Sequence, residues 1–146
     1  MHYVCRVNAA SESTPQTILC TVDFSATTQQ SIEWGIIMAR QLRAHLTILF
    51  VYRLILDRGG EIFHLKKAIE EEAQRKFNEL EKDFLNGQGL SYDFKIEVGF
   101  VSDRIEDYAK KTSLRFLVIN RSIESNSNET LDELFEHIHI PMLLVP

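Results

Sequence analysis

The feature that most constrains the fold of this sequence is an alternation of short apolar runs with segments of helical periodicity. Four runs, at residues 17–22, 45–52, 115–119 and 141–146, are only a few residues long and rich in aliphatic and aromatic residues, as buried parallel strands are. A fifth run, at residues 92–98, alternates apolar with charged residues. Such alternation indicates one face in contact with solvent, so we expect this strand at or near a sheet edge.

The segments between these runs carry apolar residues every three or four positions, as amphipathic helices do. Ser25 and Ser102 each follow a strand and precede such a stripe, so we predict that they are helix N-caps. Asn86 and Gly87 end the longest stripe, where glycine suits a left-handed cap. The stripes run through residues 32–42, 62–84, 105–112 and 131–138.

Parallel strands joined by helices require crossover connections, and these are right-handed. If the strand order reverses once, helices cover both faces of the sheet. The sequence therefore predicts an α/β fold with an open, doubly wound, five-stranded parallel sheet. Ligands of such sheets bind beyond the carboxyl ends of the strands, at the point where the order reverses. We expect this rim to be formed by residues 23–25, 51–53, 99–102 and 120–128.

Length and composition exclude several classes of protein. The chain has 146 residues, enough for one domain, which we place at residues 17–146 after an extension at 1–16 with a short strand at 3–7. Its net charge of −5 does not favour nucleic-acid binding, and no apolar run approaches the roughly 20 residues of a membrane span. The amino terminus shows no apolar signal region, and two cysteines, Cys5 and Cys20, are too few for a disulfide framework. We expect a cytoplasmic protein.

No phosphate-binding glycine motif of the P-loop or dinucleotide type is present. A receiver domain would need further acids near Asp23 and a late lysine, which the sequence lacks. A serine nucleophile at the rim is disfavoured because capping explains Ser25 and Ser102. His137 and His139 are two positions apart and would not share a helix face, so we expect no metal site.

Asp23 is the rim residue for which two explanations remain open. An acid at the end of an apolar central strand loses hydration unless a partner or ligand compensates it. Its carboxylate either accepts hydrogen bonds from N–H groups of the following turn or contacts a ligand.

Four features, in order, resemble the universal stress protein family over residues 17–146. Residues 17–25 are similar to the family's first strand and its V-D-x-S motif, and residues 32–52 to its helix and second strand. Gly99 before a helix resembles the exit of the third strand, and residues 141–146 resemble the closing P-V-L-V-V-P. The resemblance implies the strand order 3-2-1-4-5.

The family's ATP-binding members carry a glycine motif after the fourth strand, which lets backbone amides approach the phosphates closely. The corresponding positions here are Asn120, Ile123 and the pair Asn128 and Glu129, none of them glycine. Residues 121–139 also hold one basic and five acidic residues, which would repel phosphate. The resemblance therefore favours the branch that binds no nucleotide.

Members of that branch are cytoplasmic stress-induced dimers with no established reaction. We accordingly expect a homodimer that acts through contacts with an unknown protein partner, without catalysis, cofactor or metal. Family dimers pair their last strands, and the last strand here carries no charge that would protect its edge. The predicted interface comprises Met142, Leu143, Leu144 and Val145.

Two alternatives remain open. One is a nucleotide-binding switch or weak ATPase that uses ATP with Mg²⁺, in which Ser122, Ser125 or Ser127 replaces the glycine contacts or is phosphorylated. The other is a small-ligand binder that stacks its ligand on Trp34 or Tyr52. The predicted nucleotide-site residues are Asp23, Phe24, Ser25, Val51, Asn120 and Asn128.

Overall fold

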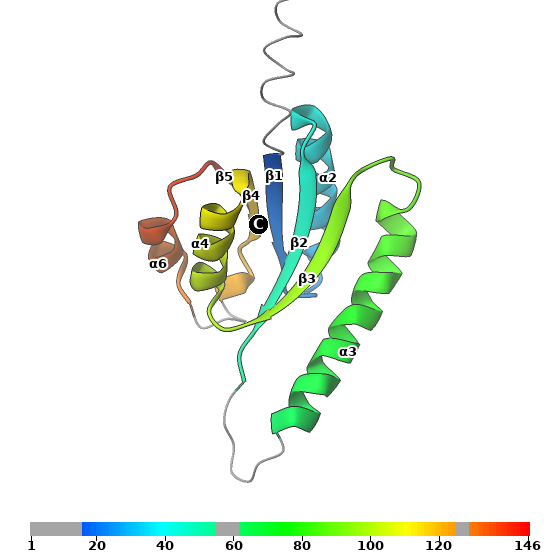
Figure 1. The fold of residues 1–146 in the computed structure, drawn as a ribbon, viewed down its shortest axis with the longest axis vertical. Helices are drawn as coiled ribbons and strands as arrows, with labels where there is room; N and C mark the ends of the chain where they lie inside the picture. The colour runs from blue at the N-terminus through cyan, green and yellow to red at the C-terminus, as the bar shows by residue number, and fades with distance from the viewer. Residues whose placement is uncertain (1–15, 55–61, 125–128) are drawn as a thin grey trace, which may run out of the picture.

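The computed structural model describes residues 16–54, 62–124 and 129–146. The predicted strand at 3–7, and Ser125, Ser127 and Asn128, lie outside these ranges. The elements follow one another as β1 (Gln16–Val22), α2 (Thr28–Leu42), β2 (His45–Tyr52), α3 (Ile62–Leu80), β3 (Tyr92–Val98), α4 (Val101–Lys111), β4 (Ser113–Asn120), α6 (Leu131–His137) and β5 (Met142–Val145). The predicted strand–helix alternation is confirmed (Figure 1).

The five strands form one parallel sheet in the order β3-β2-β1-β4-β5. The predicted doubly wound α/β fold is therefore confirmed, and the alternating strand 92–98 lies at an edge as expected. Strand order reverses between β1 and β4, so the loops that leave these two strands lie side by side at the carboxyl edge.

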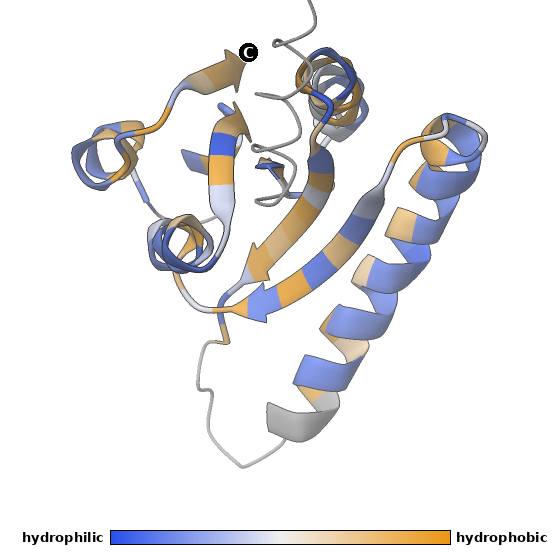
Figure 2. Ribbon diagram, turned by 45° about the horizontal axis from the view of Figure 1, so that its top comes forward, coloured by the Kyte–Doolittle hydropathy of each residue, from blue (hydrophilic) through white to orange (hydrophobic). Residues whose placement is uncertain are grey.

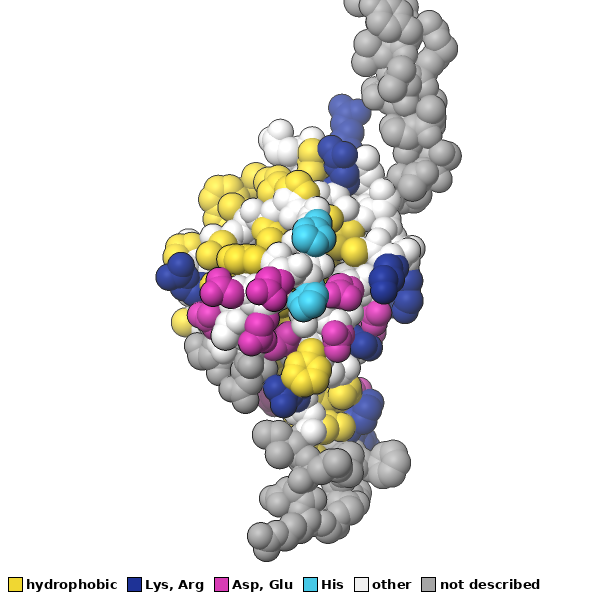
Figure 3. Space-filling model, turned by 90° about the vertical axis from the view of Figure 1, so that its left-hand side faces the viewer, with side chains coloured by type: hydrophobic (Ala, Val, Ile, Leu, Met, Phe, Trp, Pro, Cys, Tyr) yellow, Lys and Arg dark blue, Asp and Glu magenta, His cyan; other side chains and the backbone are white. Residues whose placement is uncertain are grey.

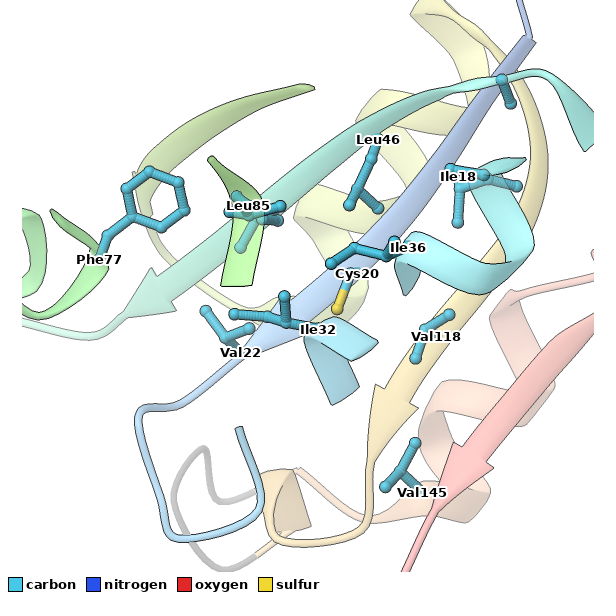
Figure 4. Close-up of a cluster of buried hydrophobic side chains, with 13 residues drawn as sticks. Ile18, Cys20, Val22, Ile32, Ile36, Leu46, Phe77, Leu85, Val118 and Val145 are labelled. Atoms are coloured by element: carbon cyan, nitrogen blue, oxygen red, sulfur yellow. The ribbon is translucent and has the colours of Figure 1, made fainter. Parts of the chain in front are cut away.

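Helices α2 and α3 cover one face of the sheet, and α4 and α6 cover the other (Figure 1). The α2 and α3 face buries alternate residues of the strands together with helix side chains such as Ile32, Ile36 and Phe77 (Figure 4). The opposite face packs against α4 and α6 through residues such as Leu49, Leu117 and Ile105. Two separate cores therefore sandwich the central strands, which explains why those strands are apolar on both faces.

Helix α3 places its apolar stripe toward the sheet and its polar side toward solvent (Figure 2). It continues into a π-helical turn, Glu81–Leu85, which buries Leu85 with only 1% of its surface exposed. Asn86 is extended, and Gly87 has φ +79°, a left-handed conformation that favours glycine. The predicted end of this helix is confirmed.

The prediction that Ser25 caps the next helix is wrong. Helix α2 begins at Thr28, its N-cap residue is Thr27, and the Thr27 side chain accepts no capping bond. Asp23 and Ser25 instead form a tight turn before the helix, in which the Thr28 N–H donates to the Ser25 carbonyl at 3.1 Å. Because of this turn the helix begins only at Thr28, and the Ser25 hydroxyl contacts the Ser122 hydroxyl at the rim instead.

Cys20 lies fully buried on β1, where its thiol donates to the Ser31 carbonyl at 3.4 Å. Burial raises the pKa of this thiol to about 12. The reactive thiolate is therefore scarce at neutral pH, and Cys20 acts as a core residue. No helix within the described ranges is long and apolar enough to cross a membrane.

Candidate functional site

Asp23 lies at the carboxyl end of β1, and its carboxylate is held by the turn that follows. Oδ1 accepts from the Ser25 N–H at 3.0 Å and from the Thr28 hydroxyl at 3.4 Å. Oδ2 accepts from the Ser122 hydroxyl, which comes from the loop after β4. These bonds compensate the hydration that the carboxylate loses, as one of the two explanations of Asp23 requires.

Asn120 joins the β4 exit to helix α2. Only 2% of its surface is exposed, and its amide donates to the hydroxyls of Thr27 and Ser31. Its carbonyl oxygen accepts from the Ser122 N–H at 2.9 Å and lies 2.8 Å from the Ser122 hydroxyl oxygen. Asn120 therefore fixes the loop after β4 against the start of α2.

Ser122 completes a polar network across the point where strand order reverses. Its hydroxyl lies 3.1 Å from the Ser25 hydroxyl as well as contacting Asp23 and Asn120. The network comprises Asp23, Ser25, Thr27, Thr28, Ser31, Asn120 and Ser122. The structure thus brings together three of the predicted site residues, Asp23, Ser25 and Asn120.

Phe24 has the unusual left-handed φ of +56°. The turn carries its ring away from the rim to pack on Phe50 and Phe94, with ring centroids 5.1 and 6.1 Å away. Aromatic packing therefore compensates the backbone strain, and Phe24 forms part of the α3 face.

The remaining predicted residues do not join this network. Val51 packs with the core under α4 and α6. Tyr52 is 8% exposed and its hydroxyl donates to Glu70, so the proposal of Tyr52 as a stacking surface is wrong. Trp34 is 40% exposed on α2 and does not line the cleft that lies beside Asp23, which is described next. Asn128 lies outside the described residues.

A cleft beside Asp23 has a volume of about 350 Å³ and lies between the strand ends and α3. Asp23, Phe24 and Phe50 line one side, and the α3 side contributes Glu72 and Lys76 among smaller residues. The Lys76 ammonium lies 5.9 Å from the centroid of the Phe24 ring. The cleft has the size and aromatic lining of a small-molecule site, and its charged lining residues are Asp23, Glu72 and Lys76.

The amino end of α4 is capped from another part of the chain, and the prediction that Ser102 caps it is wrong. The helix begins at Val101, and its N-cap residue, Phe100, makes no side-chain capping bond. The Glu129 carboxylate accepts from the N–H groups of Val101 and Ser102, at 2.6 and 3.1 Å, and from the Ser102 hydroxyl at 2.7 Å. Glu129 is only 3% exposed, so a buried carboxylate meets the positive end of the helix dipole.

Sequence reasoning placed Glu129 at the rim but missed the helix that it caps, and it missed Thr27 and Ser31 altogether. A signal for Ser31 was present, because Ser31 stands with Thr28 on the inward stripe of α2 beside Ile32 and Gly35. Polar residues on a buried stripe require hydrogen-bond partners. Nothing in the local sequence indicates that Asn120 is the partner of Ser31.

The face formed by α4 and α6 carries many acidic side chains around two histidines (Figure 3). His137 Nδ1 lies 3.7 Å from a carboxylate oxygen of Glu106 on α4. Within residues 16–54, 62–124 and 129–146, no three histidine, cysteine or acidic side chains are placed to hold a metal ion.

At the rim, the hydroxyl oxygens of Ser25 and Ser122 lie 3.1 Å apart, and the Ser122 hydroxyl donates to the Asp23 carboxylate. These side chains therefore join the exits of β1 and β4.

The sequence profile described as the universal stress protein family matches residues 15–146. Among solved structures, the universal stress protein UspA of Lactobacillus plantarum superimposes with a TM-score of 0.74, at 18% identity, over 91% of this chain and 99% of that one. A universal stress family protein of Burkholderia pseudomallei gives 0.71, at 20% identity, over 89% and 95%. An Arabidopsis thaliana family protein with AMP bound gives 0.57, at 19% identity, over 90% and 91%. No curated protein sequence matches the chain significantly.

Proposed function

The chain belongs to the universal stress protein family, and from that premise we propose that it is a cytoplasmic homodimer that acts in the stress response through protein contacts, without nucleotide or catalysis at the carboxyl edge of the sheet. One observation carries the proposal: the polar groups at the switch point of the sheet bond to one another. Asp23 and Ser122 bridge the exits of β1 and β4, where a ligand of such a sheet would enter.

The loop after β4 supports the same proposal. Asn120 lies at the first position of the family's glycine motif, and Ser122 lies between the first and second positions, in the loop whose backbone amides would face a phosphate. Each of these residues instead uses its side chain to tie the loop to β1 and α2. Glu129 further places a carboxylate in the segment that would have to approach a phosphate, and like charges repel.

An ATP- or AMP-binding switch, or weak ATPase, is the second candidate function. The observation in its favour is the cleft of about 350 Å³ beside Asp23, with aromatic rings and Lys76 in its lining. The Arabidopsis relative was solved with AMP, and a further family structure was solved with cAMP. In this candidate the base would enter the cleft and the phosphates would lie near Ser122.

Titration calorimetry with Mg²⁺ and ATP separates the two candidates. We expect no heat of binding and no nucleotide in the mass spectrum of the purified native protein. The AMP-binding Arabidopsis relative, titrated with AMP in the same buffer, provides a positive control. Micromolar binding that disappears in Asp23→Ala would establish the second candidate and overturn the first.

The dimer is expected to form through the free edge of β5. Met142, Leu143 and Leu144 remain half-buried although β5 lies at the end of the sheet. Beside it, Met38 and Leu42 of α2 line an apolar cleft of about 450 Å³ with Phe116 and Pro141. Trp34, one turn before Met38, is 40% exposed. A second copy would cover these apolar side chains and pair with the edge of β5 that no other described strand occupies.

Leu143→Asp is therefore expected to convert the dimer into a monomer, because it places a charge in the centre of the interface. Sedimentation equilibrium at micromolar concentration measures the change. Leu65→Asp is the matched control: Leu65 is 47% exposed on α3, which covers the other end of the sheet, and the variant should stay dimeric. A monomeric wild-type protein, or a dimeric Leu143→Asp variant with an intact fold, would contradict the interface.

A further inference from the structure

A chain of three hydrogen-bonded side chains lies at the amino-terminal edge of the sheet, at the opposite end from the rim. The Ser91 hydroxyl oxygen lies 2.6 Å from His45 Nδ1, and His45 Nε2 lies 2.9 Å from Asp93 Oδ1. His45 is the first residue of β2, Ser91 immediately precedes β3, and Asp93 is its second residue. Serine, histidine and acid thus follow one another in space.

The parallel register of β2 and β3 brings these residues together. Leu46 pairs with Tyr92 and Thr47 pairs with Asp93. Because alternate residues of a strand share a face, His45 and Thr47 lie on the same side of the sheet as Ser91 and Asp93. The Leu46 N–H donates to the Ser91 carbonyl at 3.0 Å, which holds the Ser91 backbone against β2. The arrangement therefore rests on the sheet and is not confined to a loop.

The hydrogen bonds also determine the direction of proton donation. An ionised carboxylate only accepts, so the bond to Asp93 requires the proton of neutral His45 to sit on Nε2. Nδ1 is then the acceptor, and the Ser91 hydroxyl donates to it. The Thr47 hydroxyl donates to the same Asp93 oxygen at 2.8 Å, and Lys95 Nζ lies 3.8 Å from the other. Asp93 is thereby held in the orientation that fixes the ring of His45.

We propose that Ser91 is a nucleophile that accepts small acyl groups from activated esters, with His45 as its general base and Asp93 as the positioning residue. The Ser91 oxygen forms a bond to the acyl carbon while the bond between that carbon and the leaving oxygen breaks. The hydroxyl proton passes to His45 Nδ1 and then to the departing oxygen, which leaves as an alcohol or phenol. The products are an acyl ester on Ser91 and the free leaving group.

The surroundings define the class of acyl donor. Ser91 is exposed, so a donor reaches it directly from solvent. On the same face of the sheet, a cleft of about 170 Å³ is lined by Glu97, Arg104, Tyr108 and Lys111, among other residues. Burial, together with the charges of Glu97 and Asp93, raises the pKa of Tyr108, which lines this cleft, to about 12. A serine that is open to solvent suits a short acyl group on a good leaving group.

Incubation of the full chain with p-nitrophenyl acetate tests the proposal. Release of nitrophenolate gives the rate, and peptide mass spectrometry locates the acetyl group. We expect acetyl on Ser91, loss of that label in Ser91→Ala, and a rate about 100-fold lower in His45→Gln, the size typical of a lost general base. Asp93→Asn should slow acylation by at least about tenfold, because it disturbs the proton arrangement on His45.

Ser113→Ala is the matched control, because Ser113 begins β4 at the same edge of the sheet. It should acylate like the wild type. Ser91 is exposed and lies outside the strands, so the Ser91→Ala variant should fold. Its acylation therefore tests the role of Ser91 even if a His45 variant unfolds. Acetyl found only on lysines, or an unchanged rate in Ser91→Ala or in a folded His45→Gln variant, would overturn the proposal. None of these outcomes depends on whether nucleotide binds at the rim.

Discussion

Replacing Glu129 with alanine is expected to lower the free energy of unfolding by about 3 kcal/mol. The carboxylate accepts three hydrogen bonds at the start of α4, two of them from backbone N–H groups. Alanine leaves these donors unpaired in a place where only 3% of the Glu129 surface was exposed. Each unpaired buried donor costs about 1–3 kcal/mol, and the loss of favourable charge at the helix end adds to this.

Urea unfolding followed by circular dichroism measures the change. Glu129→Gln keeps an acceptor but removes the charge, so we expect an intermediate loss of about 1–2 kcal/mol. Glu133→Ala is the control: Glu133 is an exposed acid in the first turn of α6, and its change should stay within about 0.5 kcal/mol. Protein concentration must be fixed, because dimerisation would contribute to stability. A Glu129→Ala variant as stable as the wild type would refute the capping role.

Replacing Gly35 with leucine is expected to destabilise the protein by about 3 kcal/mol or more. Gly35 lies where α2 crosses β1 and β2 at close range. A Cβ atom there would lie 3.1 Å from Leu46 Cδ1, 3.5 Å from Cys20 Cβ and 3.7 Å from Cys20 Sγ. Both neighbours are fully buried, so a leucine side chain has no room unless α2 moves away from the sheet.

Gly35→Ala separates crowding from backbone effects. Alanine in a helix interior is favoured over glycine by about 1 kcal/mol, while its Cβ displaces the flexible end of Leu46 by a few tenths of an ångström. These effects oppose each other, so Gly35→Ala should change stability by less than about 1 kcal/mol. Thermal unfolding of both variants provides the measurement. Equal stability of Gly35→Leu and the wild type would show that α2 does not need this close approach.

Much of the fold could be predicted because its signals are local. The apolar runs gave five strands, and the alternation at 92–98 identified the edge strand β3. Helix starts were less well predicted, since Ser25 and Ser102 satisfy the composition of an N-cap without performing its role. A hydroxyl beside a helix has several partners open to it, and the choice depends on neighbours that local sequence does not specify.

The candidate site shows the same division. Asp23 and Asn120 were identified from their positions at strand ends, and the structure places both at the switch point. Val51 was assigned to the same rim, yet its side chain turns to the core below α4 and α6 because successive strand residues face opposite ways.

The sequence by itself determined the alternation of strands and helices, the edge position of β3 and the family, because periodicity and short motifs are properties of neighbouring residues. Only the tertiary structure decided which side chains meet. Asp23 contacts Ser122 across 99 positions of chain, Glu129 caps a helix that begins 28 positions earlier, and His45 meets Ser91 across 46. Such partners are set by strand register, crossover direction and loop geometry, which act over the whole fold and leave no local periodicity.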